Sequence, residues 1–83
     1  MTEQRETFDA VKEHLEGRGI EGAKITPEAE LLRDLDLDSL DTMELTLGME
    51  ERFGIEIPDE DLEGLVTVAD AVRLIESKLA ATV

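Results

Sequence analysis

The serine that follows three alternating aspartates is the part of this sequence best placed to do chemistry. It belongs to the segment Asp34-Leu35-Asp36-Leu37-Asp38-Ser39-Leu40, directly before a helical pattern. Three interpretations are open. Asp38 or Ser39 could cap the helix by accepting a hydrogen bond from a free backbone N–H. The aspartates could bind calcium, or another enzyme could modify the hydroxyl, because a helix N-terminus exposes it and favours a phosphate there.

Calcium is the weakest of the three interpretations. Asp34, Asp36 and Asp38 match positions 1, 3 and 5 of an EF-hand loop, but position 6 is Ser39 instead of Gly. Position 12 is Leu45, where that loop needs a bidentate Glu. We therefore expect no specific metal site, only weak binding of divalent cations such as Mg²⁺ to the many carboxylates.

Catalysis by the chain itself is not expected. Near Ser39 the sequence has neither a His or Lys to activate the hydroxyl nor the glycines of an oxyanion hole. The single histidine, His14, is predicted to be a solvated residue on the first helix. The sequence thus predicts that the chain is not an enzyme.

Composition narrows the function further. The 83 residues include 22 Asp and Glu but only 8 Lys and Arg, for a net charge of −14. Such a charge disfavours nucleic acid and anionic membranes as partners. The absence of Cys excludes disulfides and thiolate chemistry within the chain. The length predicts one domain, residues 1–83. The polar start and the absence of a long apolar run predict a cytoplasmic protein, which we also expect to be a monomer.

Apolar spacing and turn residues predict an all-α fold, a small four-helix bundle with three longer helices, one short helix and a long loop between the first two. The first helix is expected from Thr2 to Glu16 and is ended by Gly17-Arg18-Gly19. The loop is expected over 20–38, and a short helical turn could form in it after Pro27. The second helix is expected from Ser39 to Phe53, the short one within 58–64, and the last from Thr67, where Asp70 completes a capping box.

The second helix has two apolar faces. One consists of Leu40, Met43 and Leu47, and the other of Leu45, Met49 and Phe53. We assign the second face to the core, with Phe53 as an anchor. Its expected neighbours are Phe8, Val11, Leu15, Leu65, Val68, Val72 and Ile75. The first face, rimmed by acids, is either a docking surface for a partner or buried by the bundle.

Three segments together resemble the acyl carrier protein family. Residues 34–45 are similar to the family's attachment motif, 50–61 to the end of its second helix and its acidic third helix, and 67–72 to its final helix. The resemblance covers Phe8 to about Leu79. One departure is Asp36, because the family often has Gly at this position. The Gly-Gly-x-Ser form typical of peptidyl carriers is absent.

This resemblance implies that Ser39, flanked in the motif by Asp38 and Leu40, carries 4′-phosphopantetheine. The group would be installed from coenzyme A by a Mg²⁺-dependent phosphopantetheinyl transferase, with Asp38 helping to position the metal. It would hold acyl chains as thioesters for ketosynthases and other acyl-processing enzymes with basic docking patches. The implied docking residues are Leu40, Asp41, Met43, Glu44, Leu47, Glu50, Glu51 and Glu60. Candidates to line a cavity for the acyl chain are Met49, Ile57, Leu65 and Ile75.

Two pathways and one other class of function stay open. The preferred hypothesis is a carrier for dissociated (type II) fatty acid biosynthesis, and the alternative is a free-standing carrier for a polyketide or other secondary-metabolite pathway. Both would use the same site residues. A protein of a different class, an acidic helical adaptor without a covalent group, would share the docking face but would not need the serine.

Overall fold

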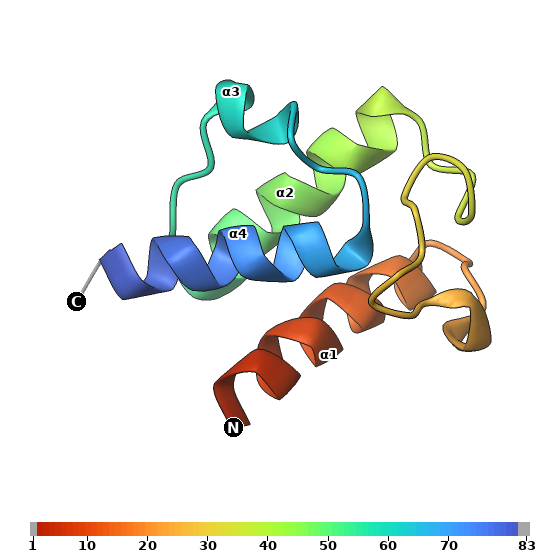
Figure 1. Ribbon diagram of the computed structural model, residues 1–83, viewed down its shortest axis with the longest axis horizontal. Helices are drawn as coiled ribbons and strands as arrows, with labels where there is room; N and C mark the ends of the chain where they lie inside the picture. The colour runs from red at the N-terminus through yellow and green to blue at the C-terminus, as the bar shows by residue number, and fades with distance from the viewer. Residues whose placement is uncertain (1, 82–83) are drawn as a thin grey trace.

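The computed structural model describes residues 2–81, with side chains described for 6–80, and within them the fold is all α (Figure 1). The elements in chain order are α1 (Thr2–Gly17), the short 3₁₀ helix η1 (Gly22–Lys24), α2 (Ser39–Phe53), α3 (Asp59–Leu62) and α4 (Val68–Ala81). Helix α1 packs against both α2 and α4. The predicted bundle of three longer helices and one short helix is confirmed.

Glycine ends the second helix as predicted. Gly54 adopts a left-handed conformation, with φ of 67°, and its N–H donates to the carbonyl of Glu50 over 2.8 Å. A residue with a Cβ is strained in this conformation, so glycine is the favoured residue for this C-terminal cap. The chain therefore turns away from α2 directly after Phe53.

The core is aliphatic, and the long loop contributes to it. The largest fully buried hydrophobic side chains include Leu15 of α1, Leu31 of the loop and Leu45 of α2. The loop adds further buried residues that the helical patterns did not predict, namely Ile25, Ala29, Leu35 and Leu37. Since residues 18–38 bury so much apolar surface, this connection is part of the packed structure.

The predicted aromatic anchor is wrong. Phe53 is only half-buried and packs at the margin of the core, as does Phe8. Leu65, another expected core residue, is also half-buried, whereas Val68 and Ile75 are buried as predicted. The loop residues Leu31, Leu35 and Leu37 are buried in the core, whereas the two phenylalanines and Leu65 pack at its margin.

Backbone hydrogen bonds join the loop to the start of α4. The N–H of Val68 donates to the carbonyl of Ala29 and that of Ala69 to the carbonyl of Pro27, each over 2.9 Å. In the other direction, the N–H of Leu31 donates to the carbonyl of Val66 over 2.8 Å. The first N–H groups of a helix have no partner within it, so here the loop satisfies two of them.

The predicted capping box at the start of α4 is confirmed. The N–H of Asp70 donates to Oγ1 of Thr67, and Oδ2 of Asp70 accepts from the N–H of Thr67, each over 3.1 Å. The N–H groups of Thr67 and Val66 also lower the pKa of the Asp70 carboxyl, since they stabilise its ionised form. This cap and the loop together fix where α4 begins.

The helical turn expected after Pro27 is absent. Pro27 and Glu28 form a tight turn instead, in which the N–H of Ala29 donates to the carbonyl of Thr26 over 3.1 Å, and the short helix η1 lies earlier, at Gly22–Lys24. The physical reason is that the carbonyls of Pro27 and Ala29 are directed to α4. They are therefore not available for hydrogen bonds within a local helix.

Side chains also link the helices. Oγ1 of Thr7, which is buried, donates to Glu76 and so joins α1 to α4. Arg52 of α2 pairs with Glu13 of α1 over 3.1 Å. Lys78 of α4 pairs with Asp61 over 2.8 Å and so holds the short helix α3. Within residues 2–81, none of the helices has the length and apolar character needed to span a membrane.

Candidate functional site

Ser39 is the first residue of α2, and the cap of that helix is its neighbour Asp38. Oδ1 of Asp38 accepts from the N–H of Asp41 over 2.8 Å, while Oδ2 of Asp41 accepts from the N–H of Asp38 over 3.3 Å. This reciprocal pair is a capping box built from two aspartates. Ser39 is exposed, and within the described residues its hydroxyl takes part in no hydrogen bond. The side chain of Ser39 is thus left accessible to an enzyme.

The residue that departs from the family pattern has an unusual backbone. Asp36 has a φ of 57°, the only positive φ among the described residues other than glycine. Left-handed conformations favour glycine, and Asp is among the side chains that tolerate them best. Asp36 can therefore replace the family's glycine while the loop keeps the shape that leads into Ser39.

The three aspartates before Ser39 do not form a metal site. Oδ2 of Asp34 accepts from the N–H of Glu30 over 2.8 Å, and Asp38 caps α2. Over residues 2–81 the structure brings no set of three carboxylate or imidazole side chains together as metal ligands. The carboxylates of Asp34 and Asp38 instead stabilise the backbone on either side of Asp36.

One apolar face of α2 is exposed and the other is buried. Leu40, Met43 and Leu47 keep 62%, 43% and 52% of their surface accessible. On the opposite face Leu45 and Met49 are buried in the core. Of the two outcomes expected for the first face, burial by the bundle is therefore wrong. We call Leu40, Met43 and Leu47 the exposed stripe.

The acids predicted for docking lie in different environments. Asp41 and Glu44 both pair with Arg18, which follows α1. The hydrogen bond from the N–H of Asp38, together with Arg18, lowers the pKa of Asp41. Glu50 is half-buried, and its Oε2 accepts from the N–H of Ile57 over 2.6 Å, so it also shapes the turn after α2. Glu51 and Glu60 are exposed residues.

The prediction for His14 is wrong. It is half-buried, its Nε2 atom is buried, and its ring lies against Gly48 of α2. Burial lowers the pKa of the imidazole, as does the positive charge of Arg18, while Glu44 acts in the opposite direction. His14 therefore belongs to the contact between α1 and α2.

The residues proposed to line an acyl cavity belong to one buried region. Met49, Ile57 and Ile75 are buried members of the core, and Leu65 packs against it. They come from α2, the segment after it, the start of the connection to α4, and α4 itself. All four side chains are hydrophobic, so they would offer an acyl chain an apolar surface.

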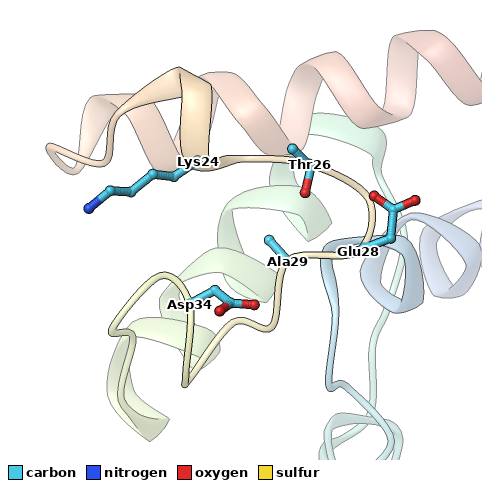
Figure 2. A pocket seen from close by; sticks show the side chains of 5 residues that line it. All are labelled: Lys24, Thr26, Glu28, Ala29 and Asp34. Carbon is cyan, nitrogen blue, oxygen red and sulfur yellow. The ribbon is translucent and has the colours of Figure 1, made fainter.

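The loop also forms an open hollow of about 390 Å³, which the sequence did not predict. It is lined by Lys24, Thr26, Glu28, Ala29 and Asp34. Figure 2 shows the two stretches of loop that border it, with the ammonium group of Lys24 pointing away. Since Asp34 is already hydrogen-bonded to the loop backbone, the hollow lacks a set of free polar groups that converge.

Comparison with known proteins finds similarity over most of the chain. A family model described as a phosphopantetheine attachment site matches residues 9–75. The acyl carrier protein of Helicobacter pylori strain G27 is 53% identical over 62 residues, which is 74% of this chain and 80% of the relative, and the protein of strain HPAG1 matches equally well. A solved structure of the acyl carrier protein from Enterococcus faecalis, reported for its high thermal stability, superposes with a TM-score of 0.76. It is 36% identical, and the match covers 90% of this chain and 96% of that one.

Proposed function

Since the chain belongs to the acyl carrier protein family, we propose that Ser39 is its attachment point and that it serves dissociated fatty acid biosynthesis. The chain is a carrier and not an enzyme, and its phosphopantetheine-attachment domain carries 4′-phosphopantetheine covalently. This group supplies a thiol on which acyl chains are held as thioesters. We also propose a docking face for partner enzymes and a cavity for the acyl chain.

The observation that carries the proposal is the position of Ser39. It is exposed at the start of α2, its hydroxyl takes part in no described hydrogen bond, and Asp38 caps the helix in its place. The N-terminus of a helix favours a phosphodiester, because the free N–H groups and the helix dipole stabilise negative charge. The described residues around Ser39 therefore support an attached phosphopantetheine at this position. We propose that Asp38, beside it, assists the Mg²⁺ used during transfer.

The exposed stripe supports the proposed docking surface. Leu40 directly follows Ser39, and Met43 and Leu47 continue along α2 with Glu44 and Glu51 nearby. A small apolar strip bordered by acids suits brief contact with enzymes that present Lys and Arg, because charge raises the rate of encounter. Short-lived complexes are what a carrier needs when it passes one substrate between several enzymes.

The acyl chain is proposed to enter the core beside Met49. Met49 and Ile75 are among the most buried side chains, and the adaptable thioether of methionine can repack around chains of different length. The short helix α3 and Leu65 cover this region from one side and are less buried. Entry between α2 and α3 would therefore displace fewer contacts than entry between α1 and α4.

The length of the relatives supports the proposed pathway. The match covers 80% of the Helicobacter pylori acyl carrier proteins, so these relatives are close in length to this chain. A relative of that length has room for one carrier domain, which exchanges substrates with separate enzymes by diffusion, as a dissociated synthase requires. We propose such a synthase as the setting in which this chain works.

Incubation with coenzyme A, Mg²⁺ and a phosphopantetheinyl transferase tests the attachment point. The intact mass should rise by one phosphopantetheine group, and Ser39→Ala should abolish the increase. The matched control is Ser77→Ala on α4, the only other serine of the chain and also exposed, which should be modified like the wild type. A wild-type mass unchanged with several transferases would favour the unmodified adaptor.

A second experiment tests the pathway. The modified protein is loaded with an acyl group and offered to a ketosynthase of dissociated fatty acid synthesis and to one from a polyketide pathway. The proposal expects a higher kcat/KM with the fatty acid enzyme. A clear preference for the polyketide enzyme would support the alternative carrier function while leaving Ser39 as the attachment point.

A further inference from the structure

Arg18 occupies two of the acids on the face proposed for docking. Its Nη1 atom donates to Glu44 and its Nη2 atom to Asp41, so one guanidinium joins carboxylates one turn apart on α2. The side chains are partly open to solvent, with 34% of Arg18, 25% of Asp41 and 44% of Glu44 accessible. Arg18 comes from the segment after α1, which is 23 residues from Asp41 in the chain.

Asp41 and Glu44 together bind one cationic group, the guanidinium of Arg18. Asp41 and Glu44 flank the exposed stripe between Leu40 and Leu47, where a docked enzyme would place its basic residues. The planar guanidinium matches paired carboxylates better than an ammonium group does, because it donates two hydrogen bonds in a fixed geometry. The contact with Arg18 shows that the spacing of Asp41 and Glu44 suits one arginine.

We propose that Arg18 is an internal competitor for this site, which a partner's arginine must displace when it docks on the exposed stripe. The proposal rests on the proposed carrier function. Competition would weaken docking of enzymes that use a basic residue at Asp41 and Glu44, and it would speed their release. Enzymes that rely instead on acids such as Glu51 or Glu60 would be unaffected, so Arg18 helps to set which partners bind tightly.

A simple structural role for Arg18 predicts something different. In that case the ion pairs would only fasten the end of α1 to α2, as Arg52 and Glu13 do elsewhere in the same contact. Loss of such a fastener would lower stability and leave partner affinity unchanged or weaker. Competition predicts the opposite effect on affinity, because removal of Arg18 would free both carboxylates.

The test compares Arg18→Gln with Arg52→Gln. Each variant loses one positive charge. Arg52→Gln loses the single ion pair with Glu13, whereas Arg18→Gln loses two ion pairs and frees Asp41 and Glu44. The steady-state KM of a phosphopantetheinyl transferase for each carrier is measured at low and at high ionic strength. Circular dichroism and thermal melting establish that both variants are folded.

We expect Arg18→Gln to lower the KM roughly two- to fivefold relative to Arg52→Gln at low salt, the range that an exposed ion pair supports. The difference should shrink at high salt, which screens such pairs. An equal or higher KM for Arg18→Gln would overturn the proposal while Ser39 modification stands. A wild-type protein that gains no mass would remove the proposed function and this inference with it.

Discussion

The imidazole of His14 on α1 lies directly over Gly48 on α2. A Cβ atom placed on Gly48 would lie 2.8 Å from Cε1 of His14 and 2.9 Å from its Nδ1 atom, which is closer than side-chain atoms pack. Glycine in the interior of a helix costs about 1 kcal/mol relative to alanine. Its presence here allows the two helices and the ring to approach.

Gly48→Ala should therefore lower stability despite the better helix propensity of alanine. We expect the free energy of unfolding to fall by about 1 kcal/mol, because overpacking costs of about 1–3 kcal/mol exceed the gain in propensity. In the His14→Ala background the same substitution should raise the free energy of unfolding by up to about 1 kcal/mol. Urea titration of the four proteins measures this cycle, and additive effects would show that the two residues do not interact.

The same imidazole predicts a dependence of stability on pH. Burial, aided by Arg18, lowers the pKa of His14 in the folded protein, while Glu44 opposes the shift. The unfolded chain therefore binds a proton first as the pH falls below about 7, and the free energy of unfolding decreases. This contribution is fully present above the unfolded pKa of about 6.5 and is lost below it.

Urea titrations at a series of pH values between 5 and 7.5 give the measurement. His14→Gln should show a flatter profile than the wild type across this range. Asp41 and Asp70 also have lowered pKa values, so their stabilising effect is lost only at more acidic pH and does not overlap the window of His14. A wild-type slope that persists unchanged in His14→Gln would contradict this explanation.

Asp36→Gly should stabilise the loop that leads to Ser39. The left-handed backbone of Asp36, with φ of 57°, costs a residue with a Cβ about 1–2 kcal/mol, and glycine removes this cost at the expense of a more flexible unfolded chain. We expect a net gain of about 0.5–1 kcal/mol in the free energy of unfolding.

Asp36→Asn is the control for charge, because asparagine also tolerates this conformation. Any gain it shares with Asp36→Gly comes from relief of repulsion among the acids. Only the additional gain of the glycine variant reports the backbone. If the two variants had the same stability, the backbone conformation of Asp36 would carry no measurable cost.

The three longer helices were predictable because each has a repeating apolar face and a recognisable start or end. The capping box of Thr67 and Asp70 and the glycine after Phe53 lie within a few residues of the ends they determine. The two apolar faces of α2 were also evident from spacing alone. Which of them is buried depends on the arrangement of the other helices.

The parts that were missed depend on contacts between distant residues. Ile25, Leu31 and Leu35 are buried, but an irregular loop has no period that would reveal it. The ring of His14 is covered because Gly48 has no side chain, a match that spans two helices. Arg18 lies far along the chain from Asp41 and Glu44, so its ion pairs had no local signal.

The hydrogen bonds between the loop and α4 have a consequence for the order of events during synthesis. The backbone groups of residues 27–31 find their partners only in residues 66–69, close to the end of the described chain. While a nascent chain lacks that segment, the loop before Ser39 lacks the hydrogen bonds made by Pro27, Ala29 and Leu31. The loop that leads to Ser39 would thus gain these backbone hydrogen bonds only after the start of α4 has been synthesised.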